Sequence, residues 1–168
     1  ARPFEISVPD VQLHRLQQRL ITATFPDELE DAEWDMGVPL GGDETAGNNW
    51  RDGFNWRQKE QELNESLNHF LVPITVTGFG GLDIHCLHHT SRNPNAVPLL
   101  FIHGCRPDCY QFPIKHRGAD WCLVGPGSFL EATKLIPLLT QGDENHPAFH
   151  LVAPSLPNFG FSSAVKKV

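Results

Sequence analysis

Histidine and cysteine side chains are concentrated between positions 103 and 122 of this 168-residue chain. These residue types are common protein ligands of Zn²⁺, which binds four of them in a tetrahedral structural site. One hypothesis is therefore a zinc site that uses four of five candidate ligands: His103, Cys105, Cys109, His116 and Cys122. The cysteine spacings, with three and twelve intervening residues, are looser than the Cys-x2-Cys knuckle of most structural zinc sites. We expect no metal and no cofactor.

A second histidine group comprises His85, His88 and His89. Alternate side chains of a strand share a face, so His85 and His89 point to one side and His88 to the other. No carboxylate or cysteine is suitably spaced to complete a metal site. We interpret these residues as histidines of an edge strand.

Ser162 lies in a sequence that approaches the Gly-x-Ser-x-Gly pattern of serine hydrolases. Ala164 stands where that pattern requires its second glycine. Serine is common in turns because its hydroxyl bonds the nearby backbone. Ser162 is therefore interpreted as a turn residue.

The elements around His103 have the pattern of a βαβ unit. Residues 97–102 form an apolar run between Pro and Gly, which is typical of a strand buried on both faces. Pro126-Gly127-Ser128 then opens a helical pattern that places apolar and threonine side chains on one face: Phe129, Thr133, Ile136 and Thr140. The 21 residues from Cys105 to Gly125 do not fit this pattern.

If Cys105–Gly125 is replaced by a single Trp, the sequence from residue 99 to residue 139 becomes LLFIHGWPGSFLEATKLIPLL. This resembles the His-Gly-Trp-Pro turn of microsomal-type epoxide hydrolases, which have the α/β-hydrolase fold. Splicing could restore this Trp. If Cys105 is encoded by TGT and the intron begins after its first base, a T remains upstream. If Gly125 is encoded by GGG and the intron ends after its first base, GG remains downstream, and T joined to GG is TGG, the codon of Trp. A GCTGAC codon pair for Ala119-Asp120 would have the form of a fungal branch site. Our hypothesis is that Cys105–Gly125 is translated intron; the alternative is a genuine surface insertion.

Two tryptophan-containing segments extend the resemblance. Trp34-Asp35-x-Gly37-Val38-Pro39 and Trp50–Arg57 are similar to the segment that precedes the hydrolase fold in this family and wraps the catalytic domain and its lid. The resemblance implies a helical, Trp-rich wrapping segment over residues 1–72. The first part of an α/β-hydrolase domain, truncated at Val168, would follow over residues 73–168, with the suspected insertion at 105–125.

The resemblance also implies a mechanism. In the family an Asp attacks an epoxide carbon, and water activated by a His–acid pair hydrolyses the resulting alkyl-enzyme ester. Lid tyrosines protonate the epoxide oxygen, and the residue after His-Gly donates to an oxyanion. Only this oxyanion turn maps onto the chain, with Cys105 at the donor position and Pro126 as the family's proline: His103, Gly104, Cys105 and Pro126. No catalytic residue is expected within the chain, so a small-molecule epoxide would be the substrate of the complete enzyme and this chain alone would be inactive.

The chain in order predicts helices from Asp10 to Pro26 and over Trp56–Phe70, with an irregular polar segment, Asp27–Gly53, between them. The expected strands are Ile74–Thr77, Leu82–Thr90, Leu99–Ile102 and Phe149–Ala153. The first two of these strands form a hairpin. The sheet is expected to keep one uncovered edge, which would make the chain marginally stable.

Composition limits the remaining alternatives. The net charge of −7 argues against a nucleic-acid partner, and no apolar run has the roughly 18 residues of a membrane span. A cytoplasmic location is favoured. The alternatives to an epoxide hydrolase are a haloalkane dehalogenase-like hydrolase and a non-catalytic interaction module built from Ala1–Phe70.

Overall fold

The computed structural model describes residues 1–27, 30–31, 39–104, 127–143 and 146–166. These residues form two compact units. One unit holds the sheet and consists of residues 1–6, 61–104, 127–143 and 146–166. The other consists of residues 7–27, 30–31 and 39–60 and is helical.

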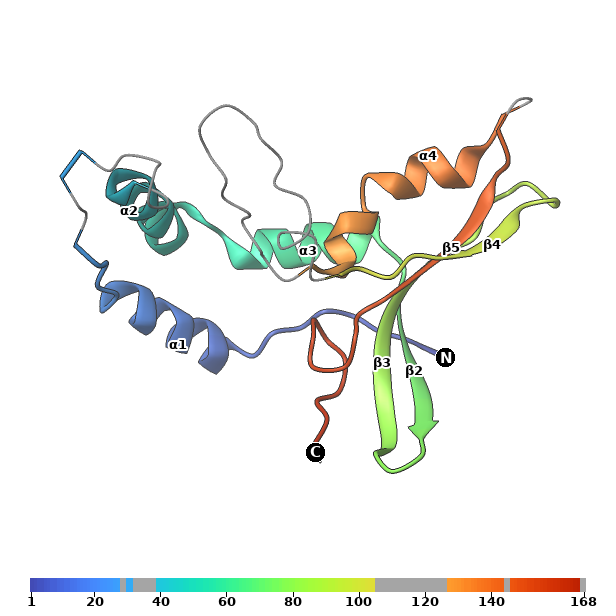
Figure 1. The fold of residues 1–168 in the computed structure, drawn as a ribbon, viewed down its shortest axis with the longest axis horizontal. Helices are drawn as coiled ribbons and strands as arrows, with labels where there is room; N and C mark the ends of the chain where they lie inside the picture. The colour runs from blue at the N-terminus through green and yellow to red at the C-terminus, as the bar shows by residue number, and fades with distance from the viewer. Residues whose placement is uncertain (28–29, 32–38, 105–126, 144–145, 167–168) are drawn as a thin grey trace. The chain divides into compact units, whose positions relative to one another are not determined.

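The sheet has five strands in the order β1-β2-β3-β5-β4 (Figure 1). The neighbouring pairs β1/β2, β2/β3 and β3/β5 are antiparallel, whereas β4 and β5 are parallel. The strands are β1 (Arg2–Pro3), β2 (His69–Val76), β3 (Gly80–His89), β4 (Val97–Leu100) and β5 (Phe149–Pro154).

The order of elements in the predicted βαβ unit is confirmed, but the predicted burial of its first strand on both faces is wrong. Val97, Leu100 and Ile102 are exposed, because β4 lies at the end of the described sheet and pairs only with β5 there. A 3₁₀ turn, Phe129–Ala132, and helix α4, Leu135–Gln141, lie between the parallel strands β4 and β5. Ser128 begins the turn because its hydroxyl accepts from the Leu130 N–H, while Glu131 accepts from the Ser128 N–H. Phe129 and Ile136 are the buried members of the predicted helix face.

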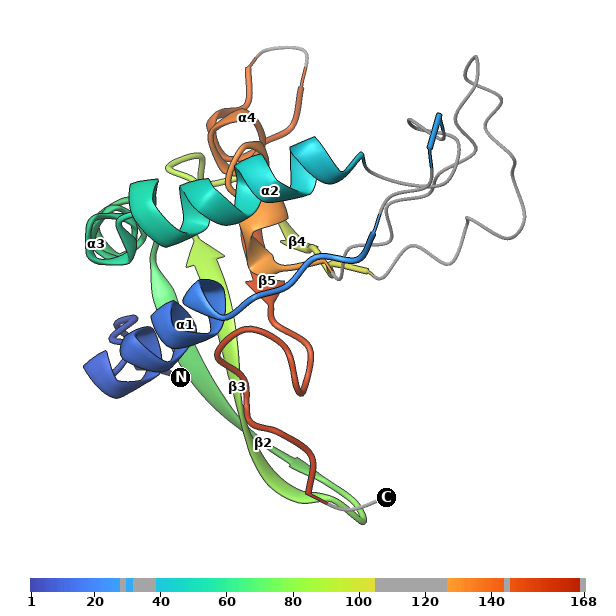
Figure 2. The same ribbon diagram turned by 90° about the vertical axis from the view of Figure 1, so that its left-hand side faces the viewer.

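The predicted hairpin is also confirmed, with β2 and β3 running antiparallel from His69↔Leu87 to Val76↔Gly80. Gly78 and Gly80 adopt positive φ angles of 87° and 82° in its turn, a conformation that glycine reaches without Cβ strain. The chain after β5 returns along β3 (Figure 2). There Ser163 and Asp83 exchange two hydrogen bonds.

Strand β3 is an interior strand, because it pairs with β2 on one side and β5 on the other. The interpretation of His85 as an edge-strand histidine is therefore wrong: its side chain is fully buried. Among the described strands, β4 is at one end of the sheet, which agrees with the expected uncovered edge.

The core of the sheet unit lies where the end of helix α3 (Trp56–Ser66), the 3₁₀ turn and α4 bury apolar side chains with those of the strands. Leu87 and Leu151 have no exposed surface. The other well-buried apolar side chains include Ile6, Leu63, Leu67, Leu71, Leu82, Phe129 and Ile136.

Helix α3 ends earlier than its sequence pattern predicts. It spans Trp56–Ser66, whereas the prediction continued to Phe70. Phe70 instead lies on β2, paired with Cys86 of β3 on one side and Pro3 of β1 on the other. Strand pairing with two neighbours satisfies more backbone groups than one further helical turn would, so tertiary context overrides the local pattern.

The helical unit contains α1, Asp10–Ile21, which ends before the predicted Pro26. Helix α2, Leu40–Asn48, and a short π-helix, Asn49–Gly53, occupy a region that was expected to be irregular, so that expectation is wrong there. Gly47 allows α2 to approach Phe25, since a Cβ at this position would lie 2.9 Å from the ring. This contact is invisible to helix propensity, which disfavours glycine.

A carboxylate organises part of the helical unit. Glu60 accepts hydrogen bonds from the Val8 N–H at 2.6 Å and from the Trp56 indole at 3.1 Å, and it pairs with Arg57. Arg57 also pairs with Asp10 at the start of α1. The Val8 N–H is the main cause that lowers the pKa of Glu60.

The Trp-rich segment is described only in part, because Trp34 lies outside the described residues. Trp50 stacks on Phe54 with ring centroids 5.8 Å apart, and both side chains are exposed. None of the described helices combines the length and apolar character that crossing a membrane requires.

Candidate functional site

His103 follows the carboxyl end of β4, beside the carboxyl end of its parallel neighbour β5. Catalytic groups of open α/β sheets lie at this end of the strands. The His103 side chain is 2% exposed, and its Nε2 accepts a hydrogen bond of 3.2 Å from the Leu156 N–H. Its ring also lies 5.5 Å from that of Phe159. The two loops that leave the parallel strands are thereby joined.

The tautomer of His103 follows from this bond. Because Nε2 accepts, Nδ1 carries the proton in a neutral ring. Within the described part of the chain, Nδ1 is a buried side-chain atom without a hydrogen-bond partner. Among the described residues this buried N–H donor has no acceptor, and leaving such a donor unpaired is costly.

Gly104 and Gly127 are in direct contact, although 22 residues separate them in the sequence. A Cβ on Gly127 would lie 2.5 Å from the Gly104 carbonyl oxygen and 3.3 Å from its nitrogen, so only glycine fits at position 127. The end of the strand and the start of the helical turn thus meet as they would in a short, uninterrupted turn. Cys105 and Pro126, the other members of the predicted turn, lie outside the described residues.

A series of buried polar side chains, linked by hydrogen bonds, ends next to Leu156, the residue that bonds His103. His69 Nε2 lies 3.1 Å from the Leu63 carbonyl, and His69 Nδ1 lies 3.0 Å from His85 Nε2. His85 Nδ1 in turn lies 2.9 Å from Ser155 Oγ. All three side chains are at most 4% exposed. Four separate parts of the sheet unit are joined through them: α3, β2, β3 and the loop after β5.

Aromatic rings surround His85. The rings of Phe4, Phe129 and Phe161 meet it edge-on at centroid distances of 5.5, 4.9 and 5.4 Å. Burial lowers the pKa of His85 to about 4, and the neighbouring His69 adds to this effect. Burial also lowers the pKa of His69, partly opposed by its bond to the Leu63 carbonyl. Both imidazoles are therefore neutral near pH 7.

The sequence did not reveal this chain of side chains. The sequence pattern indicated a metal ligand or an edge-strand histidine at His85, and it gave no signal for His69 or Ser155. Since hydrogen bonding between positions 16 and 70 residues apart depends on strand pairing, the spacing of these residues carries no signal of it.

The metal hypotheses gain no support. Within the described ranges, no group of three or more His, Cys, Asp or Glu side chains could hold a metal ion. The cysteines of the zinc hypothesis, with His116, lie outside those ranges. Ser162 bonds backbone, accepting from the His85 N–H at 2.9 Å and donating to the Ser155 carbonyl at 2.7 Å, which agrees with its interpretation as a turn residue.

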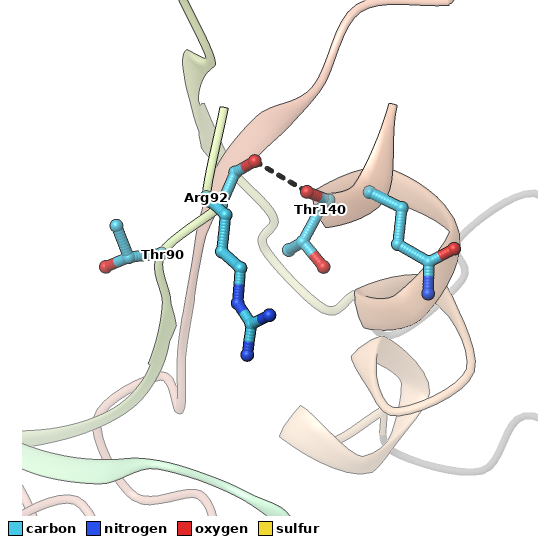
Figure 3. A pocket seen from close by; sticks show the side chains of 5 residues that line it. Thr90, Arg92 and Thr140 are labelled. Carbon is cyan, nitrogen blue, oxygen red and sulfur yellow. Dashed lines mark hydrogen bonds between the residues drawn. The ribbon is translucent and has the colours of Figure 1, made fainter. Parts of the chain in front are cut away.

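A polar pocket of about 380 Å³ lies at the other end of the parallel strands (Figure 3). It is lined by Thr90, Ser91, Arg92, Thr140 and Gln141. Ser91 donates to the Thr140 carbonyl at 2.6 Å, and its N–H bonds His150 near the start of β5. Its described lining contains one charged side chain, Arg92, and no carboxylate, so these residues do not form a general acid–base pair.

Comparison with known proteins gives one family model, described as "Epoxide hydrolase N terminus", which matches residues 1–112. A Stigmatella aurantiaca protein named as an epoxide hydrolase is 37% identical over 95% of this chain and 31% of its own length. Juvenile hormone epoxide hydrolase 2 of Ctenocephalides felis is 33% identical over 99% of the chain and 31% of its own length.

Solved structures of epoxide hydrolases also resemble this chain. Aspergillus niger epoxide hydrolase superposes with a TM-score of 0.70 at 28% identity, covering 99% of this chain and 38% of that one. The juvenile hormone epoxide hydrolase of Bombyx mori gives 0.73 at 27% identity, covering 99% and 34%. The chain therefore spans about a third of the length of the relatives that it matches.

Proposed function

Because the chain belongs to the epoxide hydrolase N-terminus family, with the α/β-hydrolase fold of its structural relatives, we propose that it supplies the N-terminal third of an enzyme that hydrolyses an epoxide to a vicinal diol. The substrate is a small-molecule epoxide. The reaction proceeds through an alkyl-enzyme ester formed by a carboxylate outside these 168 residues.

The observation that carries this proposal is the position of His103-Gly104. The pair lies at the carboxyl end of a parallel strand, and the buried His103 ring is bonded to the loop after the neighbouring strand. This is the place where an α/β hydrolase presents backbone N–H groups to an oxyanion. Hydrolysis of the ester passes through a tetrahedral intermediate, and one missing donor costs about 3–4 kcal/mol in comparable acyl transfer.

We further propose that Cys105–Gly125 is foreign to this turn. The contact between Gly104 and Gly127 supports the idea, since a single residue and Pro126 could join them. With Trp in the gap, the backbone N–H after His103-Gly104 belongs to an aromatic residue, as in the family. Shortening the connection also lowers the entropic cost of closing the loop, by about 2 kcal/mol of free energy.

The first test is to sequence the mature transcript across codons 104–126 and beyond codon 168. The complete reading frame is then expressed in two forms, one with residues 105–125 retained and one with a single Trp in their place. We expect the Trp form to convert a styrene-type epoxide to its diol and the retained form to be inactive. No diol from the Trp form would refute the proposal.

Isotope labelling tests the mechanism separately. In a single turnover in H₂¹⁸O, an alkyl-enzyme ester gives diol that contains the unlabelled carboxylate oxygen, and the label remains on the protein. Direct attack of water on the epoxide gives labelled diol instead. The 168-residue chain provides the control, because it is expected to form no diol; measurable diol from this chain would show that the catalytic groups are misassigned.

A further inference from the structure

Residues Ser155 and Leu156 connect the buried histidine pair to the candidate site. Ser155 Oγ bonds His85 Nδ1 at 2.9 Å, and the N–H of the next residue, Leu156, bonds His103 Nε2 at 3.2 Å. The Ser155 backbone is held as well, because its N–H donates to the His85 carbonyl at 2.8 Å. A displacement of His85 would therefore move the group that orients His103.

The hydrogen bonds that link the Leu63 carbonyl, His69, His85 and Ser155 all run in one direction. The Leu63 carbonyl can only accept, so His69 Nε2 is protonated and its Nδ1 accepts from the His85 Nε2–H. His85 Nδ1 is then an acceptor, and the Ser155 hydroxyl donates to it. Each ring nitrogen of His69 and His85 has one partner among the described residues. Neither ring has a second tautomer that keeps all three bonds while both rings are neutral.

Within the described residues, the phenyl rings that contact His85 cannot replace these bonds. Phe4, Phe129 and Phe161 occupy the space around His85, and the three polar side chains are almost fully buried. A broken bond would leave a buried donor or acceptor without water.

The charged and titratable groups nearby do not favour a protonated ring. On β3, Asp83 is bonded to Arg2, and Cys86 and His89 carry no negative charge near pH 7. On α3, Glu62 and Glu65 are exposed, and on the 3₁₀ turn Glu131 caps Ser128. The causes that shift the His85 pKa are burial and His69, so no carboxylate opposes them.

We propose that His69, His85 and Ser155 are positioning residues that hold Leu156 and, through it, the His103-Gly104 turn of the candidate site. The catalytic meaning of this role depends on the proposed function, but the coupling itself does not. Uptake of a proton by the buried pair reverses or breaks the bond to Ser155 and thereby loosens the Leu156–His103 contact. The turn is then correctly held only while both buried rings are neutral.

The test uses the 168-residue chain labelled with ¹⁵N. Long-range ¹H–¹⁵N spectra report the tautomer of each histidine ring, and amide exchange reports the Leu156 N–H. We expect His103 Nε2 to accept from the Leu156 N–H, as it does in the structure. On acidification, the Leu156 exchange rate should rise together with the titration of His85. A Leu156 exchange rate that the titration of His85 leaves unchanged would overturn the proposal.

Variants test the coupling at near-neutral pH. His69→Gln changes the member of the hydrogen-bonded series that lies farthest from Leu156. It should accelerate exchange of the Leu156 N–H about tenfold relative to that of the Val97 N–H. The Val97 N–H is the reference because it bonds the Ala148 carbonyl at the opposite end of β4. Ser91→Ala is the matched control for Ser155→Ala, since both serines are buried and hydrogen-bonded, but the Ser91 hydroxyl bonds the Thr140 carbonyl and not a histidine ring. Ser155→Ala should raise the ratio of the Leu156 exchange rate to the Val97 exchange rate about tenfold. Ser91→Ala should leave this ratio unchanged.

Equal acceleration of both amides in every variant would indicate loss of stability only and would overturn the proposal. This readout does not require catalysis. If the complete enzyme hydrolyses no epoxide while the coupling is observed, the proposed function fails and the positioning role stands.

Discussion

Acidification should destabilise the sheet unit through the buried His85 ring. The folded state holds this ring neutral, because burial lowers its pKa from 6.5 to about 4. The unfolded chain binds the proton more readily, so stability is fully present above the unfolded pKa and falls as the pH decreases from about 6.5 toward 4.

The magnitude follows from the same pKa. At about 1.4 kcal/mol per pKa unit, the difference between 6.5 and about 4 corresponds to about 3 kcal/mol when protonation is complete. Of this, about 2 kcal/mol is lost between pH 7.5 and 5. The lowered pKa of His69 acts in the same direction. Glu60, whose pKa is lowered from 4.5, contributes only at still lower pH.

Urea denaturation, followed by circular dichroism at about pH 7.5 and about pH 5, measures this loss. His85→Gln provides the decisive comparison, because its amide can still donate to His69 and accept from Ser155 but does not titrate. We expect it to lower stability at both pH values and to remove most of the pH dependence. His88→Gln, the same change at an exposed position of β3, should keep the pH dependence of the parent chain.

The result that would refute the reasoning is a pH dependence that His85→Gln leaves intact. The buried ring would then not be the group that takes up the proton. Unchanged stability of the parent chain over this range would refute it equally, since a fully buried imidazole must ionise on unfolding.

His103→Ala should reduce the unfolding free energy by about 2 kcal/mol or more in urea titrations, because it leaves the Leu156 N–H without its acceptor and opens a cavity; a change below about 0.5 kcal/mol would contradict the described contact. Gly142→Ala should lower the melting temperature more than Gly78→Ala, since both have positive φ but only a Cβ at Gly142 would meet backbone, at 2.9 Å from the Ala148 nitrogen. Leu87→Ala should cost about 2–5 kcal/mol by chemical denaturation, whereas Leu138→Ala, at a side chain that is 74% exposed, should cost less than about 0.5 kcal/mol, and similar losses would place the core wrongly.

Local patterns were sufficient for the βαβ unit and the hairpin. An apolar run before His103 and a Ser128-led helical pattern predict a strand and a helix, because the spacing of apolar residues decides which face can be buried. The turn glycines between β2 and β3 predict reversal of the chain for an equally local reason. Position-specific residues such as His103-Gly104 and the tryptophan segments then indicated the family.

Local patterns failed where two interactions compete. Phe70 continues the helical spacing of α3, yet it lies on β2 because strands on both sides provide partners for its backbone. The glycine-rich segment 40–48 reads as irregular, yet it is helical and its Gly47 packs against Phe25. In both cases the deciding contact comes from a residue distant in sequence.

The sequence by itself determined the family of this protein, the order of its central elements and the position of the His103-Gly104 turn, because each depends on neighbouring residues. Only the tertiary structure decided that His69, His85 and Ser155 form one buried chain of hydrogen bonds behind that turn. The register of β2 on β3 and the loop after β5 bring these side chains together, and burial then makes the two imidazoles neutral. Hydrogen bonding and burial depend on distance in space, which residue spacing along a chain does not encode.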